Sequence, residues 1–223
     1  MYLRHPSVEL QKLFASRPFQ GADPLHAVFL FVGLDANYDA DIERTRFFAR
    51  VREYHEDGPR FWRTYGVHHP FLLPDYQGDG RFYHRSFARI GFSPRHADDV
   101  SFVEAVGVPT AGRSDLEPHD LDPLHIAWLA RVLLAPGPGC VFLSSKVLRL
   151  LRSQAPLSFL PSRPSGEAFG LPLLLNAREK YFFHHQHFSA YGKAARQKQL
   201  EAEAIRKLML HADRYRNLVP SNM

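Results

Sequence analysis

The stretch that decides the fold is AVFLFVGLDANYDADI, residues 27–42, which opens with a continuous apolar run that breaks at Gly33. An apolar run bounded by a turn residue predicts a strand that is buried on both faces. Ligands of open α/β sheets bind just beyond the carboxyl ends of such strands, so Asp35 and Asn37 stand where a site is expected. The alternative is that Asp35 or Asp39 caps the following helix, because Asp and Asn are favoured at caps and turns.

The composition indicates a globular protein with one domain. The chain has 223 residues, of which 45% are hydrophobic, so we expect a single domain spanning 1–223. The apolar runs are of strand length and the first residues lack the apolar segment of a secretion signal, so no membrane association is expected. A single cysteine, Cys140, excludes a disulfide framework and favours a reducing, cytoplasmic location. The formal charge of +5 permits a phosphate-bearing partner without requiring one.

Along the chain, apolar spacing predicts strands that alternate with helices. Such strands pair in parallel and are covered by helices on both faces. We therefore expect an α/β fold, a three-layer α/β/α sandwich with a central, mostly parallel four-stranded sheet. The expected strands are residues 27–32, 100–106 and 140–143 with an edge hairpin of 171–175 and 180–184; the expected helices are 7–14, 41–54, 60–65, 81–90, 123–134, one starting at 146, and 194–215; and the expected loops are 17–26, 66–80 and 155–170.

Polar side chains follow every expected strand. Asp35 and Asn37 follow the first strand, and a polar stretch at 104–110 lies in and after the second. Serines and a lysine at 144–146 follow the third strand, and 187–189 follow the last. Because the carboxyl ends of parallel strands meet at one edge of a sheet, these groups are expected to converge on an active site.

Four segments, in order, resemble motifs of the uracil-DNA glycosylase superfamily. GLDANY, 33–38, is similar to the first motif, which reads Gly-Gln-Asp-Pro-Tyr-His or Gly-Ile-Asn-Pro-Gly in two branches. HFSAYG, 187–192, is similar to the second, His-Pro-Ser-Pro-Leu-Ser or Asn-Pro-Ser-Gly-Leu-Ser. Between them, 80–94 resembles the Asn-Arg-Phe-Trp helix of the mismatch-specific branch, and 103–118 resembles its second strand with a Pro-Thr turn.

The resemblance implies a monofunctional DNA glycosylase that acts in DNA base-excision repair. It would hydrolyse the N-glycosidic bond of a flipped-out deaminated base, and uracil is the expected base. The resemblance also implies a monomer that acts on single- or double-stranded DNA and needs neither a cofactor nor a metal. Breaking this bond develops oxocarbenium charge on the sugar and negative charge on the base. By resemblance, Asp35 stabilises the cation and orients or deprotonates a water, and a neutral His187 donates to O2 of the base; the alternative for His187 is a surface histidine in a His-rich tract.

A duplex hides its glycosidic bonds, so the base has to be flipped out and read in a pocket. By position, Phe71 matches the stacking phenylalanine of the superfamily, and backbone amides near Ala36 and Asn37 suit the base; otherwise Phe71 is core under a loop. Glu104 falls near the asparagine that pairs with N3 and O4 of uracil. An ionised Glu accepts from N3–H but cannot donate to O4. Three explanations are open: the alignment with the family motif is shifted, Glu104 is protonated, or the preferred base is not uracil alone. In the alternative without a role in base recognition, Glu104 forms a salt bridge at the end of the strand.

DNA contacts are expected on both sides of the second motif. Ser189 matches a serine that holds a DNA phosphate, and Tyr191 falls where the family inserts an apolar wedge into the duplex. Cations at the start of the last helix suit phosphate contacts, or else form a solvated charged face. The two serines after the third strand either contact phosphate or cap the next helix. The expected DNA-binding residues are Ser189, Tyr191, Lys193, Arg196, Ser144 and Ser145.

Two departures from the family pattern favour a divergent branch. Ala36 and Phe188 replace the prolines of the first and second motifs. Asn37 stands where the uracil-specific branch has a tyrosine that screens out thymine, so the pocket is expected to be more open.

Two other functions compete with the glycosylase. The first is a metal-dependent hydrolase that binds a divalent ion through the histidines at 184–187 with Asp35 and His68 or His69. No spacing typical of metal ligands supports it. The second is a non-catalytic nucleic-acid-binding module of the same fold.

Overall fold

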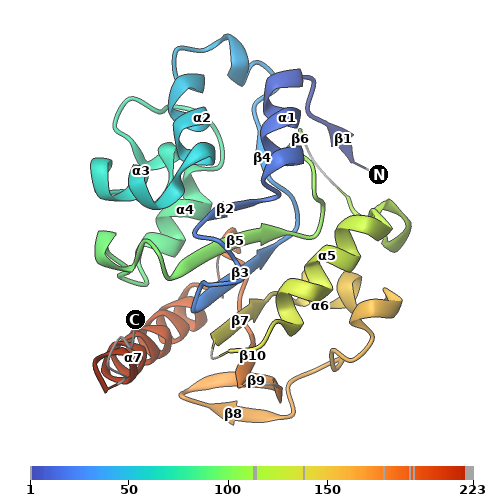
Figure 1. Ribbon diagram of the computed structural model, residues 1–223, viewed down its shortest axis with the longest axis vertical. Coiled ribbons are helices and arrows are strands. Elements are labelled where there is room, and N and C mark those ends of the chain that lie inside the picture. The colour runs from blue at the N-terminus through green and yellow to red at the C-terminus, as the bar shows by residue number, and fades with distance from the viewer. Residues whose placement is uncertain are drawn as a thin grey trace.

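The computed structural model describes residues 2–112, 115–137, 139–177, 179–190, 192 and 194–218. These residues form a mixed α/β fold whose larger sheet has seven strands in the order β2-β5-β3-β7-β10-β9-β8 (Figure 1). The strands of this sheet are β2 (Phe19–Gly21), β3 (Phe29–Gly33), β5 (Val100–Glu104), β7 (Gly139–Leu143), β8 (Gly166–Ala168), β9 (Leu171–Ala177) and β10 (Lys180–His184).

The sheet is larger than the four-stranded sheet expected from the sequence. Its central strands β5, β3, β7 and β10 do pair in parallel. Antiparallel strands extend it at both edges, β2 beside β5 and β9 with β8 beyond β10. The expected hairpin of β9 and β10 is present, but β8 forms the edge. Strands β2 and β8 lie in segments expected to be loops, because three residues among turn formers show no alternating pattern.

A second sheet of three strands ties together the loops that leave β3 and β5. It consists of β1 (Leu3–Arg4), β6 (Thr110–Ala111) and β4 (Asn37–Tyr38), with β6 in the middle. Asn37 pairs with Thr110 in parallel, and Leu3 pairs with Ala111 in antiparallel orientation. The segment just after Asp35 is therefore a short strand, so Asp35 does not cap a helix.

Local signals set most helix ends. The Asp122 carboxylate accepts from the backbone N–H of Leu124 and of His125 and so caps α5. The expected helix 41–54 was wrong in its first half, because Thr45 is extended, with ψ 149°. The helices are α1 (Val8–Ser16), α2 (Phe48–Glu56), α3 (Gly58–Tyr65), α4 (Arg81–Ala88), α5 (Pro123–Leu134), α6 (Ser145–Arg152) and α7 (Ala194–Leu218), with 3-10 turns at Ile42–Arg44, Pro70–Leu72, Pro94–His96, Pro118–Asp120 and Ala155–Leu157.

The side chains of β3 are buried on both faces of the sheet, as the apolar run predicted. Leu30 and Val32 belong to a cluster that includes side chains of α5 and α6. Phe29 and Phe31 belong to another cluster with side chains of α4 and α7. Figure 1 shows these two pairs of helices on opposite sides of the sheet. Strand β3 thus lies in the middle of the core and holds its carboxyl end rigidly.

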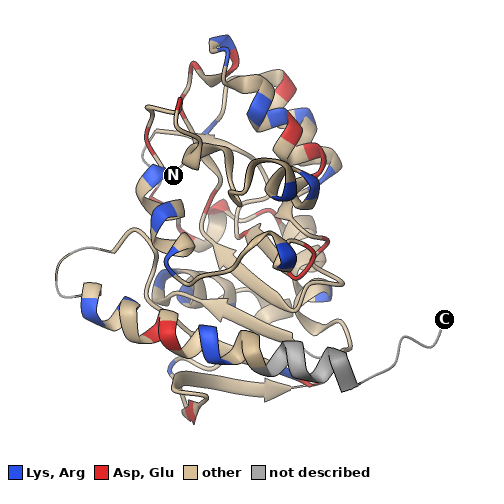
Figure 2. Cartoon of the chain, turned by 90° about the vertical axis from the view of Figure 1, so that its left-hand side faces the viewer, with Lys and Arg blue, Asp and Glu red and all other residues tan. Residues whose placement is uncertain are grey.

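Charged side chains of both signs are interspersed over the molecule. Figure 2 shows Lys or Arg alternating with Asp or Glu along α7. In the part of the chain that the structure describes, no helix combines the length and the apolar character needed to cross a membrane.

Candidate active site

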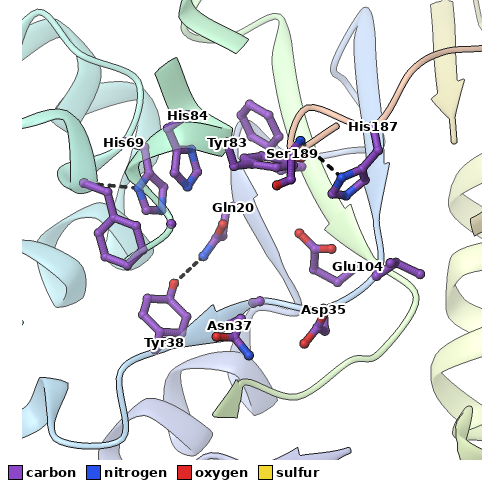
Figure 3. Close-up of a pocket in the computed structure, with 15 residues that line it drawn as sticks. Gln20, Asp35, Asn37, Tyr38, His69, Tyr83, His84, Glu104, His187 and Ser189 are labelled. Carbon is purple, nitrogen blue, oxygen red and sulfur yellow. Dashed lines mark hydrogen bonds between the residues drawn. The ribbon is translucent and has the colours of Figure 1, made fainter. Parts of the chain in front are cut away.

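A cavity of about 210 Å³ opens at the carboxyl ends of β3 and β5 (Figure 3). The loop after β3 and the end of β5 form one side, α4 and the Pro70–Leu72 turn form another, and the loop after β10 closes it. Segments far apart in sequence therefore meet at the edge where a site was expected. Of the expected site residues, those that line the cavity are Asp35, Ala36, Asn37, Phe71, Glu104, His187 and Ser189.

Asp35 is held in the cavity by the small sheet. The hydroxyl of the buried Thr110 donates to Oδ2 of Asp35. Asn37 Nδ2 in turn donates to Oγ1 of Thr110 at 3.1 Å and to the carbonyl of Gly112 at 2.5 Å. Both hydrogens of the Asn37 amide are thus used to hold β6. Asp39 does something different, because its carboxylate accepts from the N–H of Asp41 in a local turn.

Glu104 brings a second carboxyl group next to Asp35. Its side chain lies against the backbone of Gly33, and a Cβ added to Gly33 would overlap the carboxyl group. Burial, together with the neighbouring Asp35, raises the pKa of Glu104 well above its ordinary value. Glu104 forms no ion pair with any residue that the structure describes, so it is not a salt-bridged strand end. A carboxyl group with a raised pKa beside a second carboxyl group allows the two to take different roles in one reaction.

His187 faces the same side of the cavity as Asp35 and Glu104 (Figure 3). Its Nδ1 accepts the backbone N–H of Ser189 at 3.2 Å. A neutral ring therefore carries its proton on Nε2, where it can be donated. Burial lowers the pKa of His187, an effect that Asp35 opposes and Lys198 reinforces. His187 is thus arranged as a neutral hydrogen-bond donor.

Helix α7 anchors the loop that carries His187. Lys198 Nζ donates to the carbonyl oxygens of Phe188 at 3.1 Å and of Ala190 at 2.6 Å. Glu201, which is buried, accepts the backbone N–H of Gln186 at 2.8 Å. Lys198 therefore binds protein carbonyls instead of forming a freely solvated charged face.

Replacing Lys198 with Met is expected to loosen this loop. The variant keeps an apolar stem but loses two charge-assisted hydrogen bonds, each of which contributes about 1.5–3 kcal/mol. Amide hydrogen exchange across 186–190 should become faster in Lys198→Met. Lys207→Met, on an exposed position of the same helix, should leave it unchanged. Equal exchange in the two variants would show that Lys198 does not anchor the loop.

Aromatic rings form the wall opposite Asp35. Phe71 lines the cavity although only 3% of it is exposed, and one face of its ring stacks on Tyr76, with centroids 4.2 Å apart. Phe71 is therefore part of the core as well as of the cavity wall. Tyr83, from α4, lines the cavity too, and its ring lies 5.6 Å from that of His187.

Three of the other histidines, His68, His69 and His84, pack against one another. His69 stacks on His84 with centroids 3.5 Å apart, and burial lowers the pKa of His84 to about 3 and that of His69 well below its usual range. Burial also lowers the pKa of His185 to about 3, while His184 contacts Ser145. No group of three or more His, Cys, Asp or Glu side chains within the described ranges is placed to hold a metal ion.

Of the remaining expected DNA-binding residues, those that the structure describes do not line the cavity. Ser145 Oγ lies 2.7 Å from Nε2 of His184. Ser144 is buried, and its hydroxyl makes no capping bond to α6. Arg196 is exposed and lines a separate hollow of about 720 Å³ between α4 and α7. Tyr191 and Lys193 lie outside the described residues.

Several cavity residues were not singled out in the sequence. Gln20 and Tyr38 are joined by a hydrogen bond of 2.6 Å from Nε2 to Oη, and Gln20 comes from the segment that was expected to be a loop. No alternation marks β2, so only the fold reveals it. Tyr83 and His84 lie on α4, within the segment 80–94 whose resemblance to a family helix could have pointed to them. Among the residues missed are Gln20, Tyr38, Tyr83 and His84, whereas His69 was named only as a possible metal ligand.

Comparisons with known proteins add no family assignment. No protein-family model matches the chain, and no curated protein matches it at a significant level of similarity. The chemistry of the cavity therefore has to carry the functional conclusion, since a fold alone hosts many functions.

Proposed function

We propose that this chain is a monofunctional DNA glycosylase of the uracil-DNA glycosylase type, which removes a deaminated base, uracil in the first place, during base-excision repair. The observation that carries the proposal is the meeting of Asp35, Glu104 and His187 on one side of a small cavity at the end of β3 and β5. A carboxylate near the sugar and neutral donors near the base are what N-glycosidic hydrolysis needs. The four ordered motif resemblances support the same reaction.

The architecture supports this proposal at a finer level. Four parallel strands with α5 and α6 on one face and α4 and α7 on the other fit a three-layer α/β/α arrangement. We take 1–223 as one domain that works as a cytoplasmic monomer on DNA without a cofactor.

In the proposed reaction, the bond between C1′ and the base nitrogen breaks and its electron pair leaves with the base. In this reaction Asp35, which accepts a hydrogen bond from Thr110, stabilises the oxocarbenium ion with its charge and orients the water that adds to C1′. The proton released by the water is balanced by protonation of the departing base. The products are the free base and an abasic sugar with a hydroxyl on C1′.

His187 and Glu104 face the developing negative charge on the base. The Nε2–H of a neutral His187 donates to O2, because Ser189 occupies the other nitrogen. A protonated Glu104 can both donate and accept, unlike the carboxylate. Phe71 and Tyr83 supply aromatic walls for the ring of the base. Asn37, smaller than tyrosine, leaves room beside it.

His187→Ala is expected to lower the rate of base release by about 10²–10³-fold, the usual cost of removing a donor to developing negative charge. The loss should appear in single-turnover rates with saturating enzyme. His119→Ala is the matched control, because His119 has a side chain that is 81% exposed. A rate for His187→Ala within twofold of that control would contradict a role for His187 in the reaction.

The proposal is tested with oligonucleotides that contain uracil, hypoxanthine or xanthine, each single-stranded and paired, followed by alkali. Strand scission at the modified position is expected, with uracil cleaved fastest. The absence of scission on every substrate would overturn the proposed glycosylase activity. Binding of the same DNA without scission would instead favour the non-catalytic module.

A further inference from the structure

Strand β2 places an amide side chain on the floor of the cavity. Gln20 pairs with Phe102 on the neighbouring β5 in antiparallel register. Glu104 lies two residues beyond Phe102, and side chains two apart on a strand share one face. Gln20, Phe102 and Glu104 all line the cavity. Figure 3 shows Gln20 projecting into it between Tyr38 and Tyr83.

The Gln20 amide is only partly satisfied by the protein. Gln20 is 7% exposed, and its Nε2 donates to Oη of Tyr38 at 2.6 Å. The second N–H and the carbonyl Oε1 have no hydrogen-bond partner among the described residues. A largely buried amide with an open donor and acceptor beside a cavity is suited to read a polar ligand, because leaving such groups unpaired is costly.

Gln20 adds a further donor to the chemistry of the cavity. Uracil presents O2, N3–H and O4 along its edge. His187 can donate to O2, and the carboxyl group of Glu104 can accept from N3–H. O4 has two lone pairs, so it can accept from the open N–H of Gln20 as well as from a protonated Glu104. In cytosine an amino group replaces O4, and that group is itself a donor.

We propose that Gln20 is a specificity-determining residue, whose amide N–H donates to the carbonyl oxygen that deamination places on the base edge remote from the sugar. The Tyr38 hydroxyl holds Nε2 in place and so sets which end of the amide meets the base. The selected class is pyrimidines with a carbonyl group at position 4, against those with an amino group there. This inference rests on the proposed glycosylase.

The test compares uracil with 2-pyrimidinone, a uracil analogue that lacks both O4 and the N3–H, in single-stranded DNA. The native protein should favour uracil in kcat/KM. Gln20→Leu should reduce that preference by about 10–100-fold, because the contact that the variant loses to the base is the one to O4, which only uracil carries. A merely structural role would slow both substrates alike and leave the preference unchanged, which would overturn the inference. Gln154→Leu, whose side chain instead donates to the carbonyl of Pro118, should keep the native preference.

A second variant and a second measurement keep the result decisive. Tyr38→Phe removes the hydroxyl that orients Gln20 and should reduce the preference for uracil over cytosine at least tenfold; an unchanged preference would overturn the orienting role. If the native protein cleaves neither substrate, calorimetric titration with free uracil and free 2-pyrimidinone replaces the rates. Tighter binding of uracil that depends on Gln20 would support the inference even though the glycosylase had failed. Equal or absent binding would overturn the inference.

Discussion

Asp35→Asn is expected to slow base release by about 10²–10⁴-fold, the range in which positioned acid–base groups contribute. Asn keeps the shape of the side chain and can still accept a hydrogen bond from Thr110. It removes the negative charge that stabilises the sugar cation and orients the water. The loss should therefore appear in the single-turnover rate, while the dissociation constant for uracil-containing DNA stays within a few-fold of the native value.

The matched control for Asp35 is Asp39→Asn. Asp39 lies four residues further along and is exposed, and its carboxylate accepts from the N–H of Asp41 in a turn. Its loss of charge should leave the rate within twofold of the native value. Equal slowing by both variants would point to a general effect of charge on DNA binding and against a chemical role for Asp35.

The second large effect is expected at Glu104 and depends on pH. Below its raised pKa, Glu104 is neutral and can donate; above it, Glu104 is a carboxylate and the donor is lost. The native rate should fall as pH rises through that pKa. Glu104→Gln, which cannot ionise, should abolish this alkaline decline, whereas Glu104→Ala should slow the reaction about 10–100-fold throughout. The measurement is a pH profile of single-turnover rates for all three proteins.

Unfolding measurements provide the control for Glu104, because the same group affects stability. Its pKa is higher in the folded protein than the ordinary value of 4.5, so the folded state binds more protons in the window between the two. Native stability should fall as pH rises through that window, relative to Glu104→Gln, and the two should differ little below it. An alkaline decline that survives in Glu104→Gln would contradict the role of Glu104.

The central strand and its polar end could be predicted from local sequence. Residues 29–33 are all buried, as the apolar run indicated, and Gly33 marks the point where the Glu104 carboxyl group needs space. Asp35 could be placed at a carboxyl end, but its alternative role as a helix cap could be dismissed only when the structure showed β4 after it.

What could not be predicted depends on pairing between distant segments. Strands of two or three residues, such as β2, β4 and β6, carry no periodic pattern and form because a partner strand supplies their hydrogen bonds. The place of Gln20 in the cavity therefore could not be predicted from the sequence. The partners of the histidines were likewise hidden, because Ser189 on Nδ1 of His187 and the stacking of His69 on His84 depend on the folded chain.

The most direct test is product analysis by mass spectrometry after incubation with single-stranded DNA that contains one uracil. Native protein should yield free uracil and an equal amount of abasic oligonucleotide, and Asp35→Asn should yield neither on the same timescale. Intact uracil-containing DNA after incubation with native protein, or equal product from both proteins, would contradict a glycosylase centred on Asp35.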